Sequence, residues 1–220
     1  MRRRSSCGSS WGHWGMSDGW VPTRLGAICT TRRGISYTGN EVSDESGEGV
    51  PFLTIKNFLK GGGFTATGLK FFSGTDAPAF RLAPGSLLVA NTDVTRDADI
   101  IGAPLTVPAL ESAPLFSMDV SELISSSSQI DKRFLFHRLC NTDARAHMKG
   151  ASAGSTVLHL NIGQALELAF NLPPPAEQSA IARILDTLDT QIEKTQALIA
   201  KLEQVKEGLL HDLLTRGVDE

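Results

Sequence analysis

The sequence predicts an α+β protein, in which a mixed domain of short strands and short helices is followed by one long C-terminal helix. Three observations predict this class. Between Val21 and Ala113, short apolar runs alternate with Gly, Pro, Asn and Asp. Residues 131–141 then carry apolar side chains at helical spacing. From Glu177 to Leu214 the same spacing continues without a proline.

The β-like runs are short and separated by turn residues. They are RLGAICT, VPFLTI, GLKFF and GSLLVA. The glycine triplet Gly61-Gly62-Gly63 falls between two of these runs and predicts a hairpin turn, because glycine adopts positive φ without strain. We expect strands of about four to six residues joined by turns.

Two short helices are expected after the strands. The first runs from Asp131 to about Asn141, with Asp131 as its N-cap, because short polar side chains accept hydrogen bonds from the free N–H groups of a first turn. The second runs from Asn161 to Ala169, and Asn161 is its expected cap.

The long helix follows the three consecutive prolines 173–175. Pro175 suits a first helical position, where its missing N–H has no partner to lose, and the carboxylate of Glu177 complements the positive helix terminus. Its apolar residues repeat every three or four positions, which is typical of a coiled-coil seam. The expected dimerisation residues are Ile181, Leu185, Leu188, Ile192, Thr195, Ile199, Leu202, Val205 and Leu209.

A seam of this length needs a partner. Glu177 to Leu214 would span about 57 Å, longer than the domain before it, so its apolar stripe cannot be covered by that domain alone. Thr195 lies almost at the midpoint, and in an antiparallel pair of identical helices it would face itself across the two-fold axis. A parallel zipper also fits the pattern, and a helix folded back on the domain remains the alternative to dimerisation.

The chain divides into three parts on this evidence. Residues 1–15 are rich in Ser, Gly and Trp without periodicity and predict a disordered tail. Residues 16–172 form the expected globular domain, and residues 173–220 form the expected helical region. The whole chain has 220 residues, of which 41% are hydrophobic, enough for one core of ordinary size.

Composition narrows the class of protein. No apolar run approaches the ~18 to 20 residues of a membrane helix, and we expect a cytoplasmic protein. Cys7, Cys29 and Cys140 lie far apart, which indicates neither a zinc site nor a disulfide framework. The net charge of −3 permits DNA binding through a local basic patch, such as the one predicted over residues 132–149, but does not require it.

No catalytic motif stands out. The glycine triplet is not followed by GK[ST], so it is no P-loop, and the five histidines show no HExxH spacing. No GxSxG elbow supports a serine nucleophile. We therefore predict a protein without catalytic residues, cofactor-binding residues or metal ligands of its own.

Several segments together resemble a known family. The segment LPPPAEQSAIARILDTLDTQIEKTQALIAKLEQVKEGLLHDLLTRG is similar to the conserved region of the specificity (S) subunits of type I restriction–modification systems. The segments WVPTRLG, VPFLTIKNF, LAPGSLLVANTDVT and GSTVLHLN resemble parts of a target recognition domain of that family. The resemblance covers about residues 18–217. It is most specific in the helical tail.

The resemblance implies a function in DNA recognition. Residues 16–172 would be the target recognition domain, and residues 173–220 would serve for coiled-coil dimerisation and for docking of the methyltransferase (M) subunit. An S subunit is not an enzyme: S-adenosylmethionine and ATP with Mg are expected on its partner M and restriction (R) subunits. A family S subunit normally carries two recognition domains and two helices. This chain is then either a half-length protein that forms an antiparallel homodimer or half of a longer chain.

The family offers no residue code for the bases it contacts, so physical criteria select the candidates. Amide and guanidinium groups bind base edges in pairs of hydrogen bonds, while Lys, Ser and Thr bind phosphates. The expected contacts to double-stranded DNA are Arg32, Arg33, Lys56, Asn57, Lys60, Asn91, Thr92, Thr95, Arg96, Arg145, Lys149, Ser155 and Thr156.

One competing function belongs to a different class. A dimeric scaffold would use the coiled coil to recruit a protein partner and would have no DNA role. Salt-sensitive binding of duplex DNA distinguishes recognition from scaffolding. The target sequence, its spacer, and the M and R partners stay open.

Overall fold

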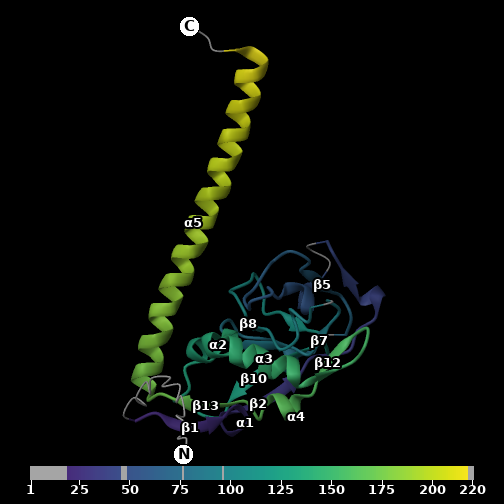
Figure 1. Ribbon diagram of the computed structural model, residues 1–220. Coiled ribbons are helices and arrows are strands. Elements are labelled where there is room, and N and C mark those ends of the chain that lie inside the picture. The colour runs from purple at the N-terminus through teal and green to yellow at the C-terminus, as the bar shows by residue number, and fades with distance from the viewer. Residues whose placement is uncertain (1–18, 46–48, 76, 96, 218–220) are drawn as a thin grey trace, which may run out of the picture.

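A globular α+β domain carries one helix that projects far beyond it (Figure 1). The computed structural model describes residues 19–45, 49–75, 77–95 and 97–217. The predicted tail 1–15 and Arg96 lie outside these residues. The predicted class is confirmed, because short strands in several sheets precede the long helix.

Short strands form four small sheets within the described residues. The largest core sheet has the order β2-β10-β6-β8, and all of its neighbours are antiparallel. A second sheet has the order β3-β5-β4-β9, a third β11-β12-β7, and β1 pairs with β13. The strands are β1 Val21–Arg24, β2 Cys29–Arg33, β3 Val42–Ser43, β4 Val50–Leu53, β5 Lys70–Phe72, β6 Leu87–Ala90, β7 Thr92–Asp93, β8 Pro104–Thr106, β9 Leu115–Phe116, β10 Val120–Ser125, β11 Ser152–Ala153, β12 Leu158–Leu160 and β13 Ala169–Leu172.

The helices are α1 Leu25–Ile28, α2 Lys132–Cys140, α3 Thr142–Gly150, α4 Ile162–Ala165 and α5 Pro175–Arg216. Helices α2 and α3 lie over the core sheet, whereas α5 projects away from the domain (Figure 1). Three 3-10 turns are η1 Gly39–Glu41, η2 Ile55–Asn57 and η3 Pro78–Phe80.

The first predicted short helix is confirmed. The carboxylate of Asp131 accepts a hydrogen bond of 2.9 Å from the backbone N–H of Arg133, as an N-cap does. The sequence pattern did not predict α3, because its apolar face consists only of Ala144 and Met148. Met148 packs against Gly102, where an added Cβ would lie 2.4 Å from the Met148 Cβ.

The second predicted short helix is shorter than expected. Asn161 caps it by accepting from the N–H of Gln164 at 3.1 Å, as predicted. The helix ends at Ala165 rather than Ala169, because the carbonyls of Leu166 and Leu168 accept from N–H groups of α1, and residues 169–172 pair with β1. The N–H of Leu25 donates to the carbonyl of Leu168 at 2.9 Å, which turns the chain into strand β13.

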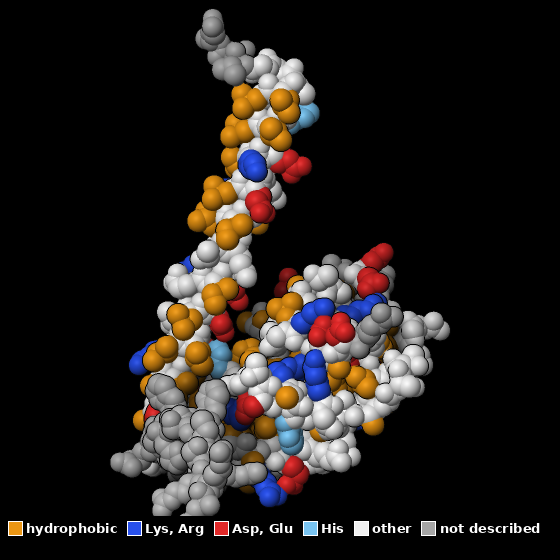
Figure 2. All heavy atoms as spheres, in the orientation of Figure 1, with side chains coloured by type: hydrophobic (Ala, Val, Ile, Leu, Met, Phe, Trp, Pro, Cys, Tyr) orange, Lys and Arg blue, Asp and Glu red, His pale blue; other side chains and the backbone are white. Residues whose placement is uncertain are grey.

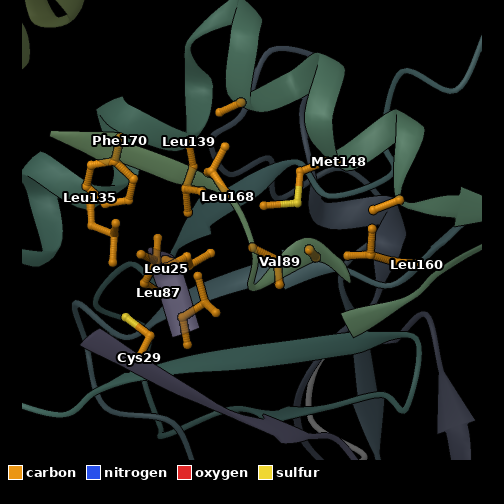
Figure 3. Packing of buried hydrophobic residues seen from close by; sticks show 14 of the residues in the cluster. Leu25, Cys29, Leu87, Val89, Leu135, Leu139, Met148, Leu160, Leu168 and Phe170 are labelled. Carbon is orange, nitrogen blue, oxygen red and sulfur yellow. The ribbon is translucent and has the colours of Figure 1, made fainter. Parts of the chain in front are cut away.

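The main core lies between the core sheet and helices α2 and α3 (Figure 3). Leu87 and Val89 of β6 face Leu135 and Leu139 of α2, and all four are buried. Burial of each such side chain contributes about 1.5–3 kcal/mol, so this layer fixes α2 and the start of α5 against the sheet. A second buried cluster, around Phe58 and Phe116 on the other side, holds the β3-β5-β4-β9 sheet in place.

The long helix α5 begins and ends close to where the sequence predicts. Pro175 occupies the first helical turn, and the carbonyl of Pro174 accepts from the N–H groups of Glu177 and Gln178. The helix has 42 residues, about 63 Å at ~1.5 Å each. It leaves the domain after its first turns and extends into solvent, so the alternative of a helix folded back on its own domain is wrong (Figure 1).

Candidate nucleic-acid interface

Strand β2 ends with two consecutive arginines that have different surroundings. Arg32 donates from Nε and Nη2 to one carboxylate oxygen of Glu122, at 3.1 and 2.5 Å, and its Nη1 donates to the carbonyl of Ala79. Its guanidinium also lies 5.7 Å from the ring centre of Phe80 and 5.6 Å from that of Phe116. These contacts occupy all three nitrogens. The Arg32 side chain therefore stabilises the fold, and we no longer expect it to contact a base.

Arg33, by contrast, is exposed. Its Nε donates to the carbonyl of Met118 at 2.5 Å. Within the described part of the chain, no acceptor pairs with its two Nη groups. Of the two arginines, only Arg33 offers a guanidinium fork to a ligand.

The next two candidates also separate. Asn57 is fully buried: its Oδ1 accepts from the N–H of Thr54 at 2.9 Å, and its Nδ2 donates to the carbonyl of Thr65 at 3.1 Å. Asn57 thus closes the η2 turn, so its inclusion among the DNA contacts is corrected. Lys56 beside it is exposed and remains a candidate.

The segment after β6 is a tightly bonded loop. Asn91 and Thr92 are buried, and Asn91 Nδ2 donates to Ser121 Oγ at 2.9 Å, so neither side chain can reach DNA in this structure. The prediction that Asn91 and Thr92 contact DNA is therefore corrected, as it is for Asn57. Thr95 is half-buried, and its hydroxyl accepts from the N–H of Asp99 at 3.0 Å.

Asp93 holds this loop, which we call the Asp93 loop and which comprises residues 93–95 and 97–101. Its carboxylate accepts three backbone N–H groups, from Thr95 and Ile100 at 2.6 Å each and from Ile101 at 2.8 Å. Burial raises the pKa of the Asp93 carboxyl, but the hydrogen bonds from Thr95, Ile101 and Ile100 outweigh burial and hold that pKa below its ordinary value. The loop is therefore fixed around a carboxylate that stays ionised.

Three predicted cations converge on the Asp93 loop. Lys60 Nζ lies 2.9 Å from the Asp99 carboxylate, and Lys149 Nζ donates to the carbonyl of Asp97 at 2.8 Å. Arg145 donates to the carbonyls of Ile101 and Asp99 at 2.9 and 2.8 Å. Burial of its guanidinium lowers the Arg145 pKa. Lys60 and Lys149 are exposed at this loop, whereas the Arg145 side chain is half-buried and stabilises the loop through its two backbone carbonyl acceptors.

Ser155 and Thr156 are exposed in the turn between β11 and β12. The face of the domain seen in Figure 2 carries Lys and Arg side chains mixed with Asp and Glu, not one continuous basic surface. The predicted contacts whose side chains are exposed are Arg33, Lys56, Lys60, Lys149, Ser155 and Thr156, whereas the Thr95 hydroxyl is used within the loop.

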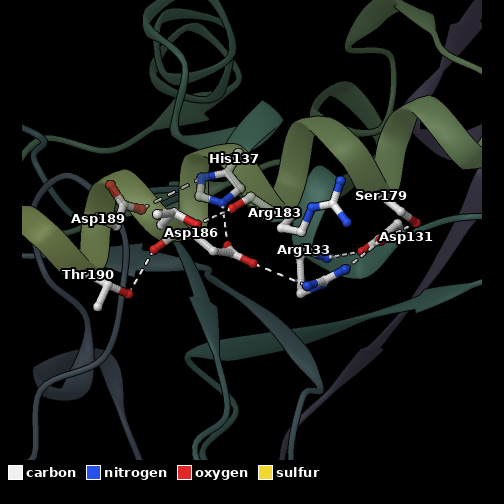
Figure 4. A network of polar contacts seen from close by, with 9 residues as sticks. Asp131, Arg133, His137, Ser179, Arg183, Asp186, Asp189 and Thr190 are labelled. Atoms are coloured by element: carbon white, nitrogen blue, oxygen red, sulfur yellow. Dashed lines mark hydrogen bonds and ion pairs between the residues drawn. The ribbon is translucent and has the colours of Figure 1, made fainter.

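A polar network joins the globular domain to α5 (Figure 4). His137 of α2 lies 2.7 Å from Asp186 and 3.8 Å from Asp189, both on α5, and Arg133 lies 3.3 Å from Asp186. Burial raises the pKa of the Asp131 carboxyl, but hydrogen bonds from Arg133 and Ser179 hold it below its ordinary value. The network orients the long helix relative to the domain.

Buried contacts fix the first turn of α5. The Gln178 side chain is buried, accepts from the N–H of Asp131 at 2.9 Å and donates to the carbonyl of Pro173 at 2.8 Å. The indole N–H of Trp20 donates to Glu177 at 3.0 Å. The Glu-Gln pair after the prolines therefore has a structural reason: each side chain bonds a different segment of the domain to the helix.

Beyond its first turns, α5 is bare, and Figure 2 shows hydrophobic side chains along it. Of the predicted seam, Ile181 packs against the main core and Leu185 is half-buried. Leu188 is 53% exposed, and the later apolar seam residues are similarly exposed. The exposed stripe also contains residues that the seam prediction omitted, namely Ile184, Leu198, Leu210 and Leu214.

The stripe continues into an open crease where α5 leaves the domain. Trp20, Phe134, Phe170, Ile181 and Leu185 are among its lining residues.

Among the described residues, no three His, Cys, Asp or Glu side chains lie close enough together to hold a metal ion. In the same part of the chain, no helix has both the length and the apolar character to cross a membrane.

A family profile described as the Type I restriction modification DNA specificity domain matches residues 17–204. The chain belongs to this family. The type I specificity subunit EcoBI of Escherichia coli is 27% identical over 201 residues, which cover 91% of this chain and 39% of EcoBI. The EcoKI specificity subunit of Escherichia coli strain K12 is 22% identical over 191 residues, covering 86% of this chain and 40% of EcoKI.

Solved structures of specificity subunits share the fold. A chain from work on complex assembly and conformational transition of the type I R-M system superimposes with a TM-score of 0.62 at 19% identity, covering 94% of this chain and 49% of that chain. The S subunit from M. genitalium gives a TM-score of 0.56 at 16% identity, over 89% of this chain and 46% of its own. This specificity-family chain thus spans about half of the solved subunits and about two-fifths of the curated ones.

Proposed function

We propose that this chain is the DNA-recognition subunit, in half-length form, of a type I restriction–modification system. It would direct methyltransferase and restriction subunits to a bipartite double-stranded DNA target. The observation that carries this proposal is the pairing of one specificity-family domain with one helix whose apolar stripe is uncovered. The match covers 91% of this chain but only 39% of EcoBI, which supports a half-length form.

In this function the chain binds and does not catalyse. S-adenosylmethionine would bind to the M subunit, and ATP with Mg to the R subunit, so this chain needs no cofactor. Its place of action is the cytoplasm, where the DNA is. The exposed outer faces of the paired helices would be the docking surface for M.

A second copy of the chain fits the stripe in an antiparallel register centred on Thr195. In this register, two residues face each other when they are equally far from Thr195 on opposite sides. Four pairs of apolar residues then meet, whereas Ile199 faces Gln191. The apolar pairs are Ile181 with Leu209, Leu185 with Val205, Leu188 with Leu202, and Ile192 with Leu198.

This register also supplies a partner for the open crease where α5 leaves the domain. The C-terminal end of one helix would lie against the first turns of the other, where Leu209 faces Ile181. The two recognition domains would then sit at opposite ends of a rod of about 63 Å, which spans at most about 18 base pairs. A two-fold dimer binds inverted half-sites separated by an unspecified spacer.

Cysteine cross-linking tests the register. The L188C/L202C variant is expected to form disulfide-linked dimers on mild oxidation, because the antiparallel pair brings each new thiol opposite the other within reach of a disulfide. L188C alone is expected to stay unlinked, as is the parent chain. Non-reducing electrophoresis gives the result. Efficient linking of L188C alone would mean that the helices are parallel.

Methylation mapping tests the function itself. Expressed with its M partner, the chain is expected to produce adenine methylation at one bipartite motif with inverted half-sites, and to bind duplex DNA with an affinity that falls as salt rises. The readouts are genome-wide maps of methylated adenine with and without this chain. If the complex neither binds DNA nor methylates a defined motif, the scaffold function is favoured instead.

A further inference from the structure

The guanidinium group of Arg33 is hydrogen-bonded through Nε, while its two Nη groups are exposed. Its Nε donates to the Met118 carbonyl at 2.5 Å, while the Nη groups at the far end of the exposed side chain have no partner among the described residues. Arg32, one residue earlier, has every nitrogen occupied. A guanidinium anchored through Nε holds its two Nη groups in a fixed direction, so the side chain loses less conformational freedom when it binds a ligand.

The support beneath Arg33 is rigid. Arg33 faces Ser121 in the β2–β10 register, and the next residue, Gly34, donates its N–H to the carbonyl of Val120 at 3.1 Å. A Cβ on Gly34 would lie 2.3 Å from the carbonyl oxygens of both Phe116 and Ser117, so only glycine allows this close approach. These contacts pack the strand end that carries Arg33 closely against residues 116–120.

The anchoring carbonyl is itself fixed. The N–H of Met118 donates to the carbonyl of Ile35 at 2.8 Å, and Asn91 Nδ2 lies 3.4 Å from the Met118 carbonyl while donating to Ser121 at 2.9 Å. The Met118 side chain is 37% exposed beside this anchor, and the Ser36 hydroxyl lies 3.2 Å from its sulfur. The surroundings of the fork thus combine hydrogen-bond donors with an apolar surface.

We propose that Arg33 is a specificity-determining residue that recognises one guanine of each half-site in the major groove. Its two Nη groups would donate to guanine O6 and N7, and Met118 would supply apolar contact to the neighbouring base. A guanidinium fork matches this pair of acceptors, which other bases do not present. The inference rests on the proposed DNA-recognition function and adds to it the residue and the base.

The test compares R33A and R33K in the assembled complex with M. Both variants are expected to lose the requirement for guanine at one position of each half-site, with discrimination there falling about 5- to 150-fold, while the other motif positions stay unchanged. R33K retains the charge but not the fork, so it separates base recognition from phosphate binding. R24A is the matched control. Arg24 is also an exposed arginine, but it lies on β1, in a different sheet from Arg33, and pairs with Glu167.

Each outcome decides between the alternatives. If R33K behaves as the parent while R33A weakens binding equally on all sequences, with a salt slope smaller by about one, Arg33 binds a phosphate and the inference is wrong. If both variants keep every base requirement of the parent motif, Arg33 does not recognise a base and the inference is wrong, although the recognition function stands. If the parent complex itself shows no motif, the proposed function fails first. Unchanged melting temperatures of R33A and R33K exclude misfolding as the cause.

Discussion

Replacement of both Ile192 and Ile199 by aspartate is expected to leave the protein monomeric. In the proposed dimer each copy places both residues in the seam, so four isoleucines per dimer are affected. Each buried side chain of this kind contributes about 1.5–3 kcal/mol, and carboxylates in the seam would add a desolvation cost. The dimer should therefore weaken by at least about a thousandfold. Sedimentation equilibrium at micromolar concentrations measures the change.

Folding and association separate cleanly in this experiment. Ile192 and Ile199 are already exposed in the single chain, so the melting temperature of the domain should not change. The double variant A197D/Q204D is the matched control: it has the same spacing and the same added charge, on the opposite face of α5. It is expected to remain a dimer. A dimer of I192D/I199D with the parent's dissociation constant would show that the stripe is not the interface.

The sequence predicted the long helix well because its signal is local and repeated. The spacing of apolar residues from Ile181 onward, together with Pro175 at the start, defines α5 to within two residues at each end. Helix α3 lacks such a signal. Only two small or flexible apolar residues form its buried face, and the partner that makes this sufficient, Gly102, lies far away in the sequence.

The site was less predictable, because residue type does not reveal tertiary partners. Arg32 and Arg33 are identical in chemistry and adjacent in sequence, but alternation along β2 sends one toward Glu122 and the other toward the Met118 turn. Asn57 had the right chemistry for a base contact, and the fold uses that chemistry to close a turn. No local pattern marks Met118 as the residue whose carbonyl orients Arg33.

Replacement of Asp93 by alanine is expected to destabilise the folded protein, because the Asp93 carboxylate accepts three backbone hydrogen bonds of the loop. D93A would leave three backbone N–H groups without an acceptor. The loss is about 1–3 kcal/mol for the buried donor of Ile101 and about 1–1.5 kcal/mol for each of the two part-buried donors, of Thr95 and Ile100. We expect the free energy of unfolding at pH 7 to fall by about 3–6 kcal/mol, as measured by urea denaturation. D97N is the control: Asp97 is an exposed carboxylate of the same loop, and its change should stay within about 0.5 kcal/mol.

The stabilising effect of Asp93 should also depend on pH in a defined direction. Because its pKa in the folded protein lies below the ordinary value, the folded state favours the ionised carboxylate. This contribution is complete above the pKa of the unfolded chain, about 3.9, and is lost as pH falls through the lower folded value. The difference in unfolding free energy between the parent and D93N should therefore be constant from about pH 5 to 8 and shrink below about pH 4. A difference that grew on acidification would mean that the carboxylate is not what holds the loop.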